Sequence, residues 1–427
     1  MKNVLKTIIA DFHSQRLRPV LPRNMILPVN SGIIISVTGV RRSGKTFLLF
    51  DTIKRLIAAG IQKRNIVYIN FEDERLSLEK NNLDLILQAY LELYPEKDLE
   101  ECYFFFDEIQ NVDGWEKFVR RIYDTISRNI YITGSNSRLL STEIATELRG
   151  RSVSYTLYPL SFSEYLDFNK AEKEYSATIQ RVKLAEHFRM FMLYGGFPEL
   201  IDLDDTLKIK KLQDYFNTII YRDLIERYDI SNSLVLKFFL KRILSQVTKP
   251  FSVNRIWKDL RSMGYRIGNN TLYEYADHIQ VSFAALMISR FDYSGIRQAK
   301  SEKKAYAIDN GILTAVDWSF SENQGKLLEN LVALELLKSG REVMYFSDTM
   351  ECDFIIMEKL SYSAIQVCWS LKESDTYKRE TGGLVNACKY LKLKRGTILT
   401  YEEESEIKKD DITIEVLPAY KYVLERL

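Results

Sequence analysis

The sequence has few residues of the kinds that build metal centres, disulfides or membrane spans. It has only three histidines in 427 residues, and their wide separation argues against a histidine-based metal site. The four cysteines, at positions 102, 352, 368 and 388, show no C-x-x-C spacing, which predicts reduced thiols in a cytosolic protein. No run approaches ~18 consecutive apolar residues, and the first residues lack the pattern of a signal peptide. We therefore expect a cytoplasmic protein without membrane contact.

An excess of charge of either sign is also absent. Lys+Arg 60 against Asp+Glu 58 gives a net charge of +2, so any surface that binds nucleic acid must be local. The hydrophobic fraction of 46% and the charged fraction of 28% are those of an ordinary globular protein. The length predicts several domains, each large enough to bury its own core.

A phosphate-binding motif is present near the N-terminus. Residues 39–46 read GVRRSGKT and fit the pattern G-x-x-x-x-G-K-[ST]. A β-branched run precedes the motif at 32–38 and apolar residues at helical spacing follow at 47–56, which is the strand–loop–helix context that the motif requires. Lys45 would reach the β- and γ-phosphates, and the Thr46 hydroxyl would ligate Mg²⁺. We therefore predict ATP and Mg²⁺ as ligands, bound by Gly39, Val40, Arg41, Arg42, Ser43, Gly44, Lys45, Thr46 and Phe47.

Polar residues follow two later apolar runs. Asp107 and Glu108 follow the run at 101–106, and ligands of open α/β sheets lie beyond the carboxyl ends of strands. Asp107 would hold Mg²⁺, and Glu108 would orient and polarise the attacking water. A further strand predicted at 129–133 ends near Ser135 and Asn136, either of which is a candidate sensor of the γ-phosphate. The alternative for that segment is an ordinary turn.

Arginines at two places are candidates for the same site. Arg149 and Arg151 flank a glycine beyond the fourth strand and suit an arginine finger acting in cis or from a neighbouring subunit, while structural salt bridges are the alternative. Arg18 and Arg23 precede the motif and are placed either near the bound base or in a solvated basic linker.

The motifs together resemble the archaeal and bacterial AAA-type ATPases that carry a C-terminal DUF4143 region. The resemblance covers nearly the whole chain and is carried by residues 39–46, 70–73, 106–115, 133–137, 148–152 and 158–162. It implies an AAA+-like P-loop ATPase core, a helical middle and a nuclease-like C-terminal part. It does not imply a known reaction.

The middle of the chain is predicted to be helical, with a break at residues 195–198. The helix–turn–helix–strand order over residues 236–293 resembles a winged helix, with 270–280 as the candidate recognition helix. That helix carries Glu274 and Asp277 but no lysine or arginine. Cations lie around it and in the following loop, at Arg255, Lys258, Arg261, Arg266, Arg290, Arg297, Lys300, Lys303 and Lys304. Binding of a DNA backbone through its phosphates and docking of a protein are both consistent with this pattern.

The C-terminal part alternates strands and helices in an order that resembles the PD-(D/E)xK nuclease core. Glu329 and Asp353 match the first two positions of its metal site. The third position holds Gln366 and Cys368, which lack the carboxylate and the lysine that the chemistry uses. We expect a degenerate site that binds rather than cleaves, unless Lys372 or Glu373 has taken over the missing role.

These observations predict an α/β chain in four parts. They are an AAA+-like ATPase domain (1–160), a helical lid or linker (161–235), a winged-helix-like domain (236–300) and a restriction-endonuclease-like domain (301–427). The expected function is Mg²⁺-dependent hydrolysis of ATP, coupled to domain rearrangement on nucleic acid or a protein partner, with an oligomer possible. The alternatives are a nucleotide-dependent binding switch with little turnover and an ATP-regulated nuclease.

Overall fold

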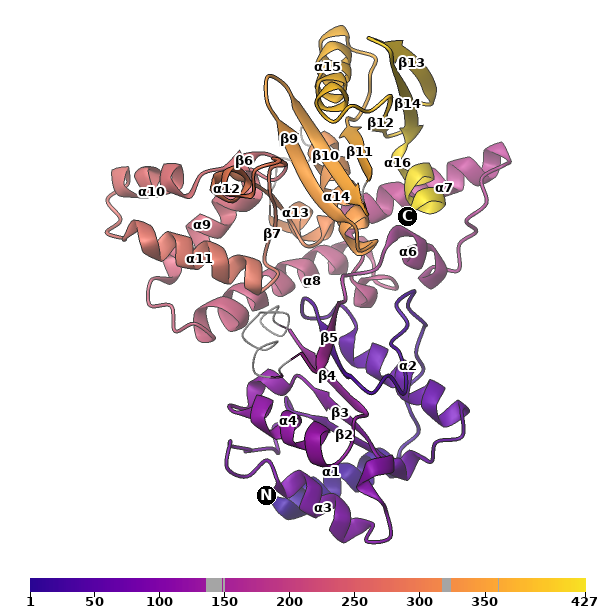
Figure 1. Cartoon of the computed structure of the whole chain (residues 1–427), viewed down its shortest axis with the longest axis vertical. Helices are drawn as coiled ribbons and strands as arrows, with labels where there is room; N and C mark the ends of the chain where they lie inside the picture. The colour runs from indigo at the N-terminus through magenta and orange to yellow at the C-terminus, as the bar shows by residue number, and fades with distance from the viewer. Residues whose placement is uncertain (136–147, 149, 317–323, 360) are drawn as a thin grey trace. The chain divides into compact units, whose positions relative to one another are not determined.

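The chain folds into two compact units, Met1–Leu157 (unit 1) and Tyr158–Leu427 (unit 2). The computed structural model describes residues 1–135, 148, 150–316, 324–359 and 361–427 (Figure 1). Within these residues no helix is both long enough and apolar enough to cross a membrane.

Unit 1 is built on a parallel five-stranded sheet with the order β2-β3-β4-β1-β5. Its helices are α1 (Lys2–Ser14), α2 (Lys45–Ala58), α3 (Leu85–Leu93) and α4 (Trp115–Thr125), and its strands are β1 (Ile34–Thr38), β2 (Ile66–Asn70), β3 (Tyr103–Asp107), β4 (Ile130–Gly134) and β5 (Ser152–Thr156). The expected α/β core with a parallel sheet is confirmed. β4 separates β1 from β3, so the loops after β1 and β3 leave the same edge of the sheet on either side of β4.

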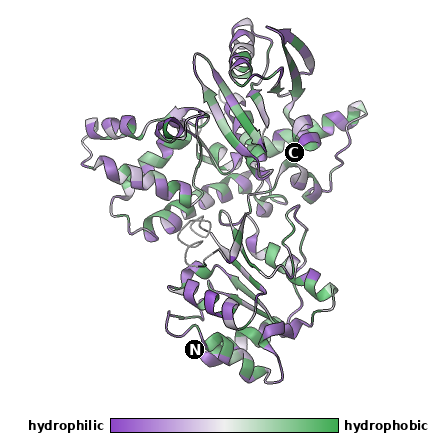
Figure 2. Cartoon of the chain, in the orientation of Figure 1, coloured by the Kyte–Doolittle hydropathy of each residue, from purple (hydrophilic) through white to green (hydrophobic). Residues whose placement is uncertain are grey.

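The strands of unit 1 are short and apolar because helices cover both faces of the sheet. On one face, α2 packs Leu48 and Ile53 against strand residues such as Phe105. On the other face, α1, α3 and α4 pack against Phe104 and Phe106. Figure 2 shows the same concentration of hydrophobic residues along the strands. This packing fixes the strand ends from which the polar loops emerge.

Unit 2 begins with helices and then forms a small antiparallel sheet with the order β6-β8-β7. The elements of this region are α6 (Phe162–Phe168), α7 (Thr178–Tyr194), α8 (Asp205–Thr218), a π-helical turn (Ile219–Glu226), α9 (Ser233–Ser245), β6 (Pro250–Phe251), α10 (Val253–Ser262), α11 (Asn269–Val281), β7 (Leu286–Ile288), α12 (Gly295–Lys300), β8 (Lys303–Tyr306) and α13 (Asn310–Val316). One local expectation was wrong. Lys303 and Lys304 lie in strand β8 rather than in a loop. β8 forms because it is the central strand of the small sheet.

Unit 2 continues with a mixed six-stranded sheet with the order β13-β14-β12-β11-β10-β9. Its elements are α14 (Gln324–Lys338), β9 (Glu342–Ser347), β10 (Glu351–Glu358), β11 (Ser361–Val367), α15 (Ser374–Tyr390), β12 (Arg395–Thr400), β13 (Ser405–Lys409), β14 (Ile412–Pro418) and α16 (Ala419–Arg426). β9, β10 and β11 pair antiparallel, and α15 leads to β12, which pairs parallel to β11. The register of β10 against β9 shifts between Cys352 and Ile355, so Asp353 lies at an irregularity that re-aims its side chain.

Candidate nucleotide-binding site

The loop after β1 is shaped by two glycines. A Cβ atom at Gly39 would lie 2.1 Å from the Leu157 carbonyl oxygen, so only glycine fits against that backbone. Gly44 has φ 100° and directly precedes α2, which leaves the helix N-terminus open toward the loop. The buried Ser43 Oγ has no hydrogen-bond partner among the described residues. A loop with tight glycines and an unsatisfied hydroxyl suits a bound anion.

Lys45 is the first residue of α2, and its side chain turns back into the loop. Its Nζ lies 3.1 Å from the Gly39 carbonyl oxygen and 3.3 Å from that of Val40. It also lies 3.2 Å from Glu108 Oε1. The ammonium group is nearly completely buried, so its charge is held at the loop by these oxygens. The ammonium group therefore lies inside the loop, where it can donate charge-assisted hydrogen bonds to phosphate oxygens.

Asp107 ends β3 and collects three hydroxyl groups. Thr46 Oγ1 donates to Asp107 Oδ2 over 2.7 Å, and the Tyr68 hydroxyl donates to the same oxygen over 2.9 Å. Thr133 donates to Asp107 Oδ1. Burial raises the pKa of Asp107, and the adjacent Glu108 carboxylate raises it further. The carboxylate and the Thr46 hydroxyl are a matched oxygen pair for Mg²⁺, which prefers such ligands.

Glu108 follows Asp107 in a left-handed conformation, with φ 51°. Its Oε2 accepts from Gln110 Nε2 over 2.7 Å and from the Ser135 backbone N–H over 3.1 Å. Burial alone would raise the pKa of Glu108, but the Lys45 ammonium and the Gln110 amide outweigh it, so the pKa lies below its usual value. Glu108 is therefore an ionised carboxylate at neutral pH and can accept a proton.

Two arginines tie the loop to neighbouring segments. Arg23 Nη1 donates to the Ser43 carbonyl oxygen over 2.8 Å, so this residue braces the loop from outside. Arg41, within the loop, places its Nη1 2.6 Å from Glu72 Oε1, and Glu72 follows β2, the edge strand of the same sheet. The loop is thus tied to the residues before β1 and after β2.

Comparison with known proteins agrees with this geometry. Residues 31–166 match a family model described as an AAA domain. The chain is 35% identical to "Uncharacterized protein MJ1544" of Methanocaldococcus jannaschii, over 98% of this chain and 94% of that protein. The chain belongs to the same family of AAA-domain proteins. An uncharacterized protein of Haemophilus influenzae is 32% identical, over 79% of this chain and 83% of its own length.

The rest of the family assignment differs from the expectation. Residues 185–323 match a domain of unknown function, DUF8612, so the expected DUF4143 region is wrong. All of the motifs that suggested it lie within residues 31–166, the AAA domain, and do not identify the region beyond that domain. The expected AAA domain is confirmed. Among solved structures, the Walker-type ATPase PABY2304 of Pyrococcus abyssi aligns with a TM-score of 0.44 at 16% identity, covering 70% of this chain and 99% of that chain.

The remaining predicted residues of the AAA domain fall in different places. Asn136 and Arg149 lie outside the described residues. Ser135 is buried beside Glu108, to which its backbone N–H donates. Arg151 Nε instead lies 2.8 Å from Asp124 Oδ1, which is the arrangement of the salt-bridge alternative. Phe47 is partly exposed on the first turn of α2.

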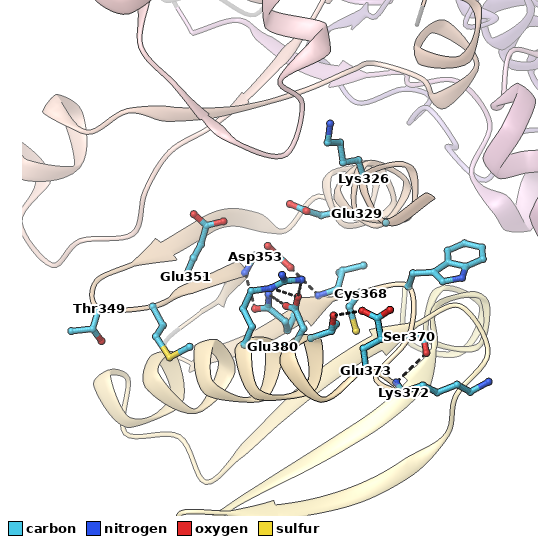
Figure 3. A pocket seen from close by; sticks show the side chains of 17 residues that line it. Lys326, Glu329, Thr349, Glu351, Asp353, Cys368, Ser370, Lys372, Glu373 and Glu380 are labelled. Atoms are coloured by element: carbon cyan, nitrogen blue, oxygen red, sulfur yellow. Dashed lines mark hydrogen bonds and ion pairs between the residues drawn. The ribbon is translucent and has the colours of Figure 1, made fainter. Parts of the chain in front are cut away.

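The predicted nuclease-like residues converge in unit 2, beside a cavity of about 760 Å³. Glu329 from α14, Asp353 from β10 and Glu380 from α15 point toward one another (Figure 3). Gln366 makes two polar contacts: its Nε2 donates to Glu380 Oε2 and its Oε1 accepts from the Asp353 backbone N–H. Cys368 lines the same cavity, and burial raises the pKa of its thiol well above the ordinary value. Lys372 and Glu373 also line the cavity.

Sequence reasoning missed residues at both sites. In the AAA domain, Tyr68 and Thr133 hold Asp107. The only hint of their role is that each carries a hydroxyl group within a buried strand, and that both strands lie beside β3. In unit 2, the sequence pattern places Lys304 among the cations of a loop, yet it is completely buried against acidic side chains. Its only signal is its place next to the exposed Lys303 in β8, since alternate strand residues face opposite sides.

Proposed function

We propose that the chain is an Mg²⁺-dependent ATP hydrolase that couples its nucleotide state to rearrangement of unit 2 on nucleic acid or a protein partner. The observation that carries the proposal is the convergence of the segments that follow β1 and β3, the two strands on either side of β4. Thr46 Oγ1 lies 2.7 Å from Asp107 Oδ2, and Lys45 Nζ lies 3.2 Å from Glu108 Oε1. The phosphate-binding loop and the acidic residues at the end of β3 contact each other. Together they supply the cation, the metal ligands and the base that phosphoryl transfer to water needs.

Each group has a distinct role in this proposal. The N–H groups of the loop and the Lys45 ammonium hold the phosphates and balance their charge. Thr46 and Asp107 would hold Mg²⁺, which when bound neutralises charge on the phosphate oxygens. Glu108 accepts a hydrogen bond and then the proton from the attacking water. Ser135 and Gln110 keep that carboxylate oriented through its second oxygen.

Replacing Lys45 by alanine is expected to weaken ATP binding by about tenfold or more, which corresponds to 1.4 kcal/mol per factor of ten. The reason is the loss of the only ammonium that lies inside the loop among the described residues. Nucleotide titration and steady-state phosphate release, with ATP alone and with DNA or RNA added, measure the effect. Lys54→Ala removes a lysine from the same helix outside the loop and is the control. If the wild type and Lys45→Ala release phosphate equally under all of these conditions, the proposed hydrolase activity is wrong.

A second candidate, a nucleotide-dependent binding switch, draws support from the small sheet of unit 2. The order α9-β6-α10-α11-β7-α12-β8, with sheet order β6-β8-β7, is compatible with a winged helix that carries the short helix α12 between its last two strands. α10 and the following turn expose four cations, Arg255, Lys258, Arg261 and Arg266, whereas α11 exposes Glu274 and Asp277. This distribution favours contact with phosphates over reading of base edges. The proposal keeps the divisions at residues 160 and 235 and a cytoplasmic location, and it extends the winged-helix-like part from residue 300 to the end of β8 at Tyr306.

The switch predicts that DNA affinity depends on the nucleotide. We expect at least about a fivefold difference in DNA affinity between the ATP-bound and ADP-bound chain, the lower end of ordinary coupling between sites. Fluorescence anisotropy with a labelled duplex measures the affinity with ATP, with ADP and without nucleotide. Combined substitution of Arg255 and Lys258 by alanine should weaken binding and reduce its salt dependence, while Lys378→Ala, at an exposed position of α15, serves as the control. Equal affinities in all three states contradict the switch.

A further inference from the structure

The acidic cluster of unit 2 is assembled by several elements of the six-stranded sheet and its helices. Asp353 lies at the register shift of β10, next to Glu351 at the start of the strand. Glu329 comes from the buried face of α14 above them (Figure 3). α15 approaches closely from the other side, because a Cβ atom at Gly383 would lie 2.1 Å from the Glu351 carbonyl oxygen. The carboxylates are therefore held together by packing.

The chain inserts its own cation into this cluster. Lys304 Nζ lies 2.7 Å from Glu351 Oε1, 3.2 Å from Asp353 Oδ1 and 3.4 Å from Glu329 Oε1. The side chain of Lys304 is completely buried. It comes from β8 of the small sheet, not from β11, where the resemblance to a nuclease places a lysine. One ammonium group is thus shared among three carboxyl groups from two elements.

Several polar atoms of the cluster have further partners. Asp353 Oδ2 accepts from the Val367 backbone N–H over 2.9 Å, and Glu329 Oε1 also accepts from the Tyr306 hydroxyl over 2.9 Å. Gln366 is engaged through both ends of its amide. Across the part of the chain that the structure describes, no group of three or more His, Cys, Asp or Glu side chains is arranged to hold a metal ion. The residues present do not fit the metal site that the nuclease resemblance implies.

We propose that the Lys304 ammonium is the resident cation of this cluster and fills the position between Glu329, Glu351 and Asp353 that a divalent metal ion would take. A tethered ammonium supplies one positive charge at every metal concentration, whereas a metal site depends on free metal and on its ligands. The wild-type cluster therefore takes no divalent metal, and the cavity beside it is not a metal-dependent cleavage site. The proposal is independent of the ATPase in unit 1.

Removing the ammonium group has two opposing effects on the stability of the cluster. Without a cation the three carboxyl groups repel one another, and the two buried ones, Glu329 and Asp353, are costly to keep ionised in the interior. A divalent cation with oxygen preference can replace the lost charge, and a ligand that binds only the folded state raises its stability. The variant Lys304→Met keeps a long side chain but no charge. Its stability is therefore expected to become dependent on divalent metal.

The test compares unfolding midpoints of the full chain, without nucleotide, in EDTA and in millimolar Mn²⁺. We expect Lys304→Met to unfold roughly 5 °C or more below the wild type in EDTA and to recover most of that difference in Mn²⁺. The double variant Lys304→Met/Asp353→Asn should not recover. Lys303→Met, the exposed neighbour on β8, is the matched control and should behave as the wild type. Electron paramagnetic resonance should count one more bound Mn²⁺ in Lys304→Met than in the wild type.

Two results would overturn the proposal. One is a Mn²⁺ ion bound by the wild type and lost in the single variant Asp353→Asn, because the ammonium would then not exclude a metal. The other is a destabilised Lys304→Met chain that Mn²⁺ fails to rescue, which would leave Lys304 as a structural ion-pair residue only. If Lys304→Met does not fold in EDTA, refolding in Mn²⁺ is the deciding measurement, and failure to recover the fold counts against the proposal.

Discussion

Replacing Glu108 by glutamine is expected to lower the rate of ATP hydrolysis by about 10²- to 10⁴-fold, the usual contribution of a positioned base, while ATP remains bound. The glutamine side chain would keep the same length and one acceptor oxygen for the Ser135 N–H, which Glu108 now holds at 3.1 Å. An amide cannot take a proton from water. Single-turnover hydrolysis and a nucleotide-binding titration on the same preparation measure the two quantities.

The control for this substitution is Asp113→Asn, which neutralises an exposed carboxylate a few residues further along the chain. It should hydrolyse ATP at the rate of the wild type. Hydrolysis by Glu108→Gln within about threefold of the wild type would exclude Glu108 as the base, since that is far below a general-base contribution. Loss of ATP binding together with hydrolysis would instead indicate that the ion pair between Glu108 and Lys45 holds the loop in shape.

The pH dependence follows from the lowered pKa of Glu108. The Lys45 ammonium and the Gln110 amide outweigh the effect of burial and lower this pKa. The carboxylate is therefore ionised at any pH above the ordinary pKa of a glutamate, about 4.3. A proton acceptor with a lowered pKa works at neutral pH and is lost only as the pH falls through that lowered value. The alkaline side of the profile is therefore set by other groups.

The nucleotide-binding site was largely predictable because its signals are local. Gly39 and Lys45 belong to one short motif, and Asp107 and Glu108 directly follow an apolar run. The rule that ligands bind beyond the carboxyl ends of parallel strands then brings the two segments together. Tyr68 was not predictable in this way, because the register that places β2 beside β3 is a property of the folded sheet.

The unit 2 site was predictable only in part because its parts are far apart in the sequence. Glu329 and Asp353 could be matched to a resemblance, but the residue that neutralises them could not. A lysine is expected at the surface, and nothing in the residues around Lys304 shows that β8 is the central strand of a sheet. Its partners lie 25 to 49 positions away in the sequence. Only the tertiary fold distinguishes Lys304 from the exposed Lys303.

A second buried carboxylate, Asp309, joins two segments of unit 2. Its Oδ2 accepts from the Gly196 backbone N–H over 2.7 Å, and its Oδ1 accepts from the Gly311 backbone N–H over 2.8 Å. The contact is close, because a Cβ atom at Gly195 would lie 1.7 Å from Asp309 Oδ1. Asp309 thus links the turn after α7 to the start of α13 through hydrogen bonds. No other residue type places two carboxylate oxygens this close to its own backbone.

Burial raises the pKa of Asp309 from 3.8 to about 6, although both backbone N–H groups oppose the shift. A raised pKa means that the folded chain binds this proton more tightly than the unfolded chain. The stabilisation from protonation is therefore complete below about pH 3.8 and is lost as the pH rises through about 6. At 1.36 kcal/mol per pKa unit, the group changes the free energy of unfolding by about 3 kcal/mol across this window.

Asp309→Ala is expected to lower the free energy of unfolding of unit 2 by about 2–5 kcal/mol, because two buried N–H groups lose their acceptor. The loss should be larger near pH 5 than near pH 8, since only the wild type gains from protonation at the lower pH. Urea unfolding at both pH values, with hydrogen exchange of the Gly196 and Gly311 amides, measures both effects. Asp214→Ala, an exposed position on α8, should change neither. A loss that is equal at the two pH values would show that Asp309 stays ionised throughout and that its role is confined to the two hydrogen bonds.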